Sequence, residues 1–199
     1  FGIAPFPEAN ERHYRFMLEG LKECSEKLEQ MGIQFVTSLI SPEEGAEIAA
    51  KNAVMAVIDR GYLRIQKLWR EKFAKKADVK VVQVESDVLV PVETASDKEE
   101  YSAATIRRKI WKSAEKFEKK IELISYNNQK KAAIKGIETV NIRDIDNIIE
   151  KLNIDKTVKK WSKYSGGRKA AEEKMGIFFN QKIDEYGNNS SNPAISGTS

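Results

Sequence analysis

The residues with the clearest chemical signature stand at the end of the chain, where a polar Asn/Ser stretch and Pro193 lead into Gly197-Thr198-Ser199. A glycine followed by two hydroxyl residues is typical of turns that bind phosphate, because backbone N–H and hydroxyl groups both donate to phosphate oxygens. An ordinary polar tail has the same composition. The pattern therefore marks a candidate phosphate-binding turn, with no helix after it.

Two other positions fit chemistry at the edge of an open α/β sheet. Asp59 ends an apolar run, where such sheets place functional residues, although a turn-forming role before Gly61 fits equally well. Gly166-Gly167 precedes a helical pattern and resembles a weak anion site, but a structural helix start is favoured. The sequence has no G-x-G-x-x-G and no Walker loop, so it supports neither a dinucleotide-binding nor a P-loop NTPase function.

The soft metal ligands are Cys24 and His13, one of each, which argues against zinc. His13 opens a helix with no evident catalytic partner, and we expect a structural role. Cys24 falls on the apolar face of the same helix and is expected to pack there. A single cysteine forms no intrachain disulfide, which fits a reducing cytoplasm.

Charge is unevenly distributed along the 199 residues. Residues 1–100 carry 14 Lys/Arg and 18 Asp/Glu, a net of −4, whereas 101–199 carry 20 and 12, a net of +8. A basic half favours a polyanionic partner, although a solvated helix surface gives the same count. One predicted helix carries a run of these basic residues: Arg107, Arg108, Lys109, Lys112, Lys116, Lys119 and Lys120.

The hydrophobic pattern indicates which elements must position these residues. Short apolar runs predict strands over 1–6, 33–40, 53–59 and 79–86, with an extended piece over 88–93. Helical spacing predicts helices over 9–32, 41–52, 61–77, 96–124, 142–154 and 163–186, separated by loops such as 125–141. Asn10 and Ser96 are the expected N-caps of the two long helices, and Gly32 the expected stop of the first.

Strands alternate with helices up to residue 94, which predicts an α/β fold: a Rossmann-like parallel sheet with flanking helices, followed by a helical linker region. The continuous apolar run at 53–59 predicts a strand covered on both faces. No apolar run approaches the ~18 residues that span a membrane. The chain starts in a strand-like run and ends in a loop, so we expect it to be a piece of a longer protein.

Four stretches together resemble class II DNA photolyases, members of the photolyase/cryptochrome family. They are ERHYRFMLEGLKE (11–23), DRGYLRIQKLWRE (59–71), VPVETASDKEEYSAATIRRKI (90–110), and Tyr186 followed twelve positions later by Thr198. The resemblance covers nearly the whole chain. It is strongest over 11–23 and 91–110 and weakest over 121–155.

The resemblance implies three regions: 1–94 as the N-terminal α/β antenna domain without its first strand and helix, 95–180 as the helical linker region, and 181–199 as the start of the FAD-binding helical domain. It implies a deoxyribodipyrimidine photolyase, a carbon–carbon lyase acting on damaged DNA. In such enzymes, blue light drives an electron from reduced FAD to a cyclobutane pyrimidine dimer, the ring bonds split and the electron returns. A cytoplasmic, monomeric protein away from membranes is expected.

The same resemblance implies site residues. Tyr186, Thr198 and Ser199 would begin the FAD site, around the flavin diphosphate, whereas catalytic residues would mostly follow Ser199. An antenna chromophore such as a deazaflavin or folate is also implied. Arg107, Arg108 and Lys109 are the candidate DNA contacts, expected to add long-range attraction.

The sequence departs from the family at two places. Arg60-Gly61-Tyr62 replaces Phe-Ser-Pro, which weakens the expectation of antenna binding, and Asn188-Asn189-Ser190-Ser191 replaces a loop with Arg and Asp. A cryptochrome-like photoreceptor is the near alternative. A free-standing α/β nucleotide-binding or interaction module is the alternative of another class.

Overall fold

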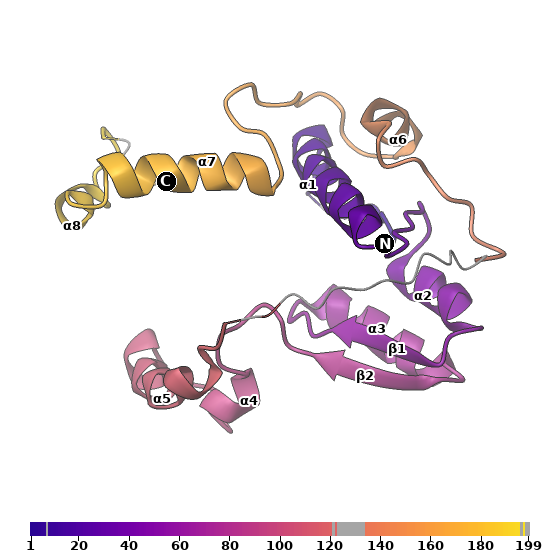
Figure 1. Ribbon diagram of the computed structural model, residues 1–199, viewed down its shortest axis with the longest axis horizontal. Coiled ribbons are helices and arrows are strands. Elements are labelled where there is room, and N and C mark those ends of the chain that lie inside the picture. The colour runs from indigo at the N-terminus through magenta and orange to yellow at the C-terminus, as the bar shows by residue number, and fades with distance from the viewer. Residues whose placement is uncertain (7, 121, 123–133, 196, 198–199) are drawn as a thin grey trace.

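A computed structural model describes residues 1–6, 8–120, 122, 134–195 and 197 (Figure 1). The two strands are β1 (Met55–Asp59) and β2 (Lys80–Val84). The helices are α1 (Glu11–Gln30), α2 (Pro42–Ala50), α3 (Arg64–Lys76), α4 (Val92–Ala95), α5 (Ala103–Phe117), α6 (Ile145–Lys151), α7 (Arg168–Gln181) and α8 (Tyr186–Asn189). Among the helices described, none combines the length and apolar character needed to cross a bilayer.

The sheet is a β1–α3–β2 unit whose strands run parallel, in register from Met55↔Lys80 to Asp59↔Val84. Parallel strands need a crossover, and α3 supplies it. Helix α2 packs beside α3, where Lys72 of α3 pairs with Glu43 of α2 at 3.1 Å. The predicted α/β class with a parallel sheet and flanking helices is confirmed, on a smaller sheet than expected.

The strands predicted at 1–6 and 33–40 were wrong as continuous strands. Within the described residues, the strand-type pairing of these segments is confined to the parallel bridge of Gly2 with Ser38, and Ser38 also forms an antiparallel bridge with Thr139. Two of their backbone hydrogen bonds reach distant segments: the Ile3 N–H donates to the Ser38 carbonyl at 2.8 Å, and the Val140 N–H to the Thr37 carbonyl at 2.8 Å. Pro5 limits further pairing of the first segment, because proline has no N–H to donate.

Strand β1 was expected to be covered on both faces, and this was wrong. Val57 is 56% exposed and Met55 is 47% exposed, while the alternate residues Ala56 and Ile58 are partly buried. Side chains on a strand alternate between faces, so one face of β1 lacks a covering layer among the described residues.

The main core lies between α1, α6 and the N-terminal segment. It is built from seven buried side chains: Ile3, Tyr14, Leu18, Ile142, Ile148, Ile149 and Leu152. Helix α1 begins as predicted at Asn10, whose side chain accepts from the Arg12 N–H, and ends before Gly32 at φ +74°. Each buried Leu or Ile contributes roughly 1.5–3 kcal/mol. This core therefore fixes α1 against a segment more than 100 residues away.

The helix predicted to start at Ser96 starts instead at Ala103, with Ser102 as its N-cap. The Ser96 hydroxyl donates to Glu100 at 2.7 Å and lies before the helix. Residues 92 and 93, predicted as the end of an extended piece, lie instead in the helical turn α4. Val90 and Ala95 pack on Ala114 of α5 in a second, smaller core.

Helix α7 follows the glycine pair as predicted, although it begins at Arg168 and none of its residues is buried. In Figure 1, α7 and α8 (yellow) extend away from α1. Residues 187–189, predicted as part of a loop, belong to the short helix α8, which begins at Tyr186.

Candidate functional site

Asp59 joins the carboxyl ends of the two strands. Its Oδ2 accepts from the Ser86 hydroxyl at 2.6 Å, and its Oδ1 accepts from the backbone N–H groups of Arg60 at 2.9 Å and Ser86 at 3.2 Å. The Ser86 hydroxyl, then the backbone donors, hold the pKa of Asp59 below its usual value. The carboxylate is thus satisfied within the protein, which favours the turn-forming role over a catalytic one.

Arg60 and Tyr62 lie where the sequence departs from the family pattern. At the same edge of the sheet they form hydrogen bonds and ion pairs with acidic residues of this chain. The Tyr62 hydroxyl donates to Glu85 Oε1 at 2.6 Å, which raises the pKa of Tyr62. Arg60 pairs with Glu93 at 2.6 Å and lies 3.6 Å from Glu85. A ligand at this edge would have to displace these pairings.

A largely apolar cavity of about 810 Å³ lies between the N-terminal segment and the sheet. Its lining includes Ile3 and Tyr14 as well as Val57, Ile58 and Phe73. The volume falls within the range of ligand pockets. Gly2 and Ser38 of the parallel bridge and residues 57–59 of β1 all line this cavity, so it adjoins two pieces of parallel backbone.

Tyr186 is the first residue of α8 and is 46% exposed, with its ring 5.5 Å from Phe178 in an edge arrangement. Gly197 is buried against Asn189, and a Cβ at position 197 would overlap the Asn189 carbonyl. The chain therefore turns back towards α8 just before the candidate phosphate turn. Thr198 and Ser199 themselves lie outside the described residues.

The three candidate DNA contacts on α5 are not equivalent. Arg107 and Arg108 are exposed and have no acidic partner among the residues described. Lys109 instead donates to Glu100 and to the Ser96 hydroxyl, and this contact lowers the pKa of Glu100 to about 2. The structure thus places Lys109 in a local network that fixes the entry to α5.

The glycine pair at 166–167 is a helix start whose N–H groups already have acidic partners. Glu19 of α1 accepts from the Gly166 N–H at 2.7 Å, and Glu23 accepts from the Lys169 N–H at 3.2 Å. Gly167 has φ +103°, a conformation that favours glycine. The structural interpretation therefore fits, because carboxylates of the protein occupy the position where an external anion would bind.

His13 and Cys24 take no part in a site. The Nδ1 atom of His13 accepts from the Asn10 N–H at 3.1 Å and completes the capping box of α1, which is the structural role expected. Cys24 is exposed, so the expectation that it packs in the core was wrong. The core covers the N-terminal half of α1, around Tyr14 and Leu18.

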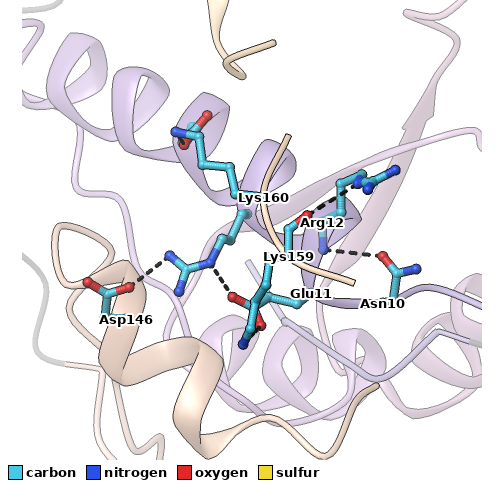
Figure 2. A network of polar contacts seen from close by, with 8 residues as sticks. Asn10, Glu11, Arg12, Asp146, Lys159 and Lys160 are labelled. Carbon is cyan, nitrogen blue, oxygen red and sulfur yellow. Dashed lines mark hydrogen bonds and ion pairs between the residues drawn. The ribbon is translucent and has the colours of Figure 1, made fainter. Parts of the chain in front are cut away.

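Sequence reasoning missed the buried carboxylate Glu11, which is 3% exposed (Figure 2). It accepts hydrogen bonds from Arg15 at 2.7 Å and from Lys159 at 2.8 Å. Arg15 also forms an ion pair with Asp146 at 2.8 Å. The hydrogen bonds from Lys159 and then Arg15 lower the pKa of Glu11. The Glu11/Arg15 spacing was visible in the sequence, but the distant partners were not.

These elements and contacts define an α/β domain followed by helices, and its sequence matches the family model described as DNA photolyase over residues 3–126. The chain belongs to the DNA photolyase family.

Two relatives carry the name deoxyribodipyrimidine photo-lyase. The one from Methanothermobacter thermautotrophicus is 49% identical over 118 residues, which cover 59% of this chain and 26% of the relative. The one from Potorous tridactylus is 38% identical over 115 residues, covering 55% of this chain and 22% of the relative. The matched part thus spans about a quarter of the length of these relatives.

Proposed function

We propose that this chain is the N-terminal part of a deoxyribodipyrimidine photolyase of class II, a light-driven lyase that splits cyclobutane pyrimidine dimers in DNA. The 49% identity to a relative of that name carries the proposal. The chain would supply the α/β domain and linker and would need the remaining length of its relatives for catalysis.

The division into 1–94, 95–180 and 181–199 belongs to this proposal. The apolar cavity beside β1 supports a further strand in the first region, because a parallel strand placed there would lie between β1 and the residues paired with Ser38. It would also cover part of Ile58, which is only partly buried. The longer protein would be monomeric and cytoplasmic.

FAD is the proposed cofactor, and reduced FAD would supply the electron that opens the dimer. Tyr186, Thr198 and Ser199 would contact its diphosphate. Support comes from the exposed Tyr186 and from Gly197, which brings the chain back against Asn189 near the same helix. Hydroxyls and amides suit this role because they solvate a diphosphate without adding redox-active groups.

An antenna chromophore, a deazaflavin or a folate, is a finer part of the proposal. It would contact Arg60 and Tyr62. Arg60 already donates a hydrogen bond to Glu93, and the Tyr62 hydroxyl donates to Glu85. Damaged DNA is the proposed partner, and the exposed Arg107 and Arg108 of α5 would add long-range attraction.

The test is to express the reading frame that contains this chain together with its flanking sequence and to illuminate it with a dimer-containing oligonucleotide. Light-dependent loss of dimers, absent in the dark, is the expected result. A protein that holds FAD but leaves dimers intact under blue light would instead favour the cryptochrome-like photoreceptor. A reading frame that ends soon after Ser199 would favour the free-standing module.

A further inference from the structure

The segment 156–169 is the most strongly basic stretch outside α5. It contains Lys156, Lys159, Lys160, Lys163, Arg168 and Lys169, and no acidic residue. Arg12 of α1 joins it by donating to the Lys159 carbonyl at 3.3 Å (Figure 2). Lys174 of α7 adds an eighth cation. We call these eight residues the basic surface.

Carboxylates offset only part of this charge. Glu11 pairs with Lys159, Glu19 with Lys160, and Glu172 with Arg168. A fourth, Glu23, accepts from the backbone of Lys169. Eight cations against these four carboxylates leave the surface positive. In the described part of the chain, Lys163 and Lys169 have no side-chain ion pair.

Two aromatic rings lie within the basic surface. Trp161 and Tyr164 have their ring centroids 4.5 Å apart with 40° between planes, and Lys174 lies 3.9 Å from the Tyr164 centroid. Trp161 is 47% exposed and Tyr164 is 38% exposed. An indole that is half open to solvent offers a surface on which a nucleobase can stack.

The backbone around these rings is held in place. Gly166 packs so tightly on α1 that a Cβ there would overlap the Phe16 carbonyl, and its N–H donates to Glu19 at 2.7 Å. Lys159 and Lys160 are tied to α1 through Glu11 and Glu19. The aromatic pair is thus fixed at both ends of its loop, which reduces the entropy lost when a ligand binds.

We propose that the basic surface and the pair Trp161/Tyr164 form a binding site for single-stranded DNA that does not depend on a lesion. Proteins that bind single strands combine cations along the backbone with aromatic rings that stack on successive bases. Lys163 and Lys169 would contact phosphates, and Trp161 would stack on one base. This names a further contact of the DNA partner and in that respect rests on the proposed function.

The experiment measures binding of a fluorescent, undamaged deoxyoligonucleotide to the 199-residue chain in the dark, as a function of salt. The Trp161→Ala variant should weaken the Kd at least about 5-fold, the lower end for loss of one stacked base, while Trp161→Phe should retain most of the binding. The double variant Lys163→Ala/Lys169→Ala should reduce the slope of log K against log salt by about 1.4, since each phosphate contact on a single strand contributes ~0.7.

The matched control is Lys51→Ala/Lys75→Ala, which removes the same charge from exposed positions at α2 and on α3. Circular dichroism checks that every variant is folded. No binding at low salt, or an equal loss in the control, would overturn the proposal. So would tighter binding to a duplex that is insensitive to Trp161. The assay needs neither light, flavin nor dimers, so its failure leaves the photolyase proposal standing, and the reverse also holds.

Discussion

At the scale of residues, Glu11 is a buried carboxylate whose ionisation bears on the stability of the fold. Its carboxylate is buried, and both its cationic partners lie within 2.8 Å. Its pKa in the folded protein is below the ordinary value of 4.5. A carboxylate with a lowered folded pKa stabilises the protein above its unfolded pKa, and this stabilisation is lost as pH falls through the folded pKa.

We therefore expect Glu11→Gln to lower the free energy of unfolding by about 1.5–3 kcal/mol at pH 7, the range for hydrogen bonds to charged groups. The variant should also lose stability less steeply than the native chain below pH 4.5. Urea unfolding at pH 7 and pH 3 measures both effects. The matched control is Glu172→Gln, which breaks the exposed pair with Arg168 and should change stability by less than about 1 kcal/mol. Equal effects of the two changes would contradict a buried role for Glu11.

At the scale of elements, the start of α7 depends on glycine in a way that its interior does not. A Cβ at Gly166 would overlap the Phe16 carbonyl of α1, whereas a Cβ at Gly176 meets no atom within 4 Å. The same substitution should therefore have opposite signs at the two positions.

Gly166→Ala is expected to lower the free energy of unfolding by about 1–3 kcal/mol through steric overlap. Gly176→Ala should raise the stability of α7 by about 0.5–1 kcal/mol, because alanine is the better helix former. Unfolding followed by far-UV circular dichroism compares the two variants directly. A destabilising Gly176→Ala would show that α7 packs against something at that position.

Helix α5 divides its basic residues between structure and binding. Lys109→Ala should lower the melting temperature, because it leaves Glu100 without its cation at the helix entry.

Arg107→Ala/Arg108→Ala should leave the melting temperature unchanged. In the longer protein it should slow association with dimer-containing DNA, more at low salt than at high salt, without altering the preference for the dimer. Stopped-flow measurements test the slower association, and competition with undamaged DNA tests the unchanged preference for the dimer. Loss of that preference would place lesion recognition on α5.

The elements that the sequence predicted well carry their information locally. Asn10 and Gly32 delimit α1 through caps that involve only neighbouring residues. The β1–α3–β2 unit follows from short apolar runs around a helical pattern. Ser96 and Ser102 are alike as caps, and what separates them is the pairing of Lys109 with Glu100, which no local pattern shows. The distant partner of Glu11 was hidden for the same reason, since Lys159 lies 148 positions away.

At the scale of the whole molecule, the cavity beside β1 and the open face of α7 both mark places that the rest of a longer protein would cover. Apolar residues line the cavity, and Met175, Ile177 and Phe179 of α7 are about half exposed, so neither surface has a covering layer among the described residues. We expect the chain alone to retain no FAD after purification, because Tyr186 and the turn at Gly197 supply one edge of a pocket that needs walls on several sides. An absorption spectrum tests this, and a stoichiometric flavin band would contradict it.

Extending the chain at its N-terminus by the segment that precedes it in the reading frame should raise the melting temperature and reduce aggregation. A strand in the cavity would bury Val57 or Ile58 and remove an open sheet edge, a feature that promotes association. Thermal unfolding and light scattering compare the two chains. The absence of any change in both would mean that the cavity is not a strand position.

The contacts of α1 also set an order of events during synthesis. Glu11 leaves the ribosome early, yet its partner Lys159 is translated 148 residues later, which takes about 7–30 s at 5–20 residues per second. The interval is almost the same for Glu19, whose hydrogen-bond donor, the Gly166 N–H, lies 147 positions later in the chain. Over that interval the nascent α1 carries carboxylates that have no distant cation to meet and an apolar face without α6. A pause in translation before residue 159 would therefore prolong the time for which Tyr14 and Leu18 are accessible to chaperones.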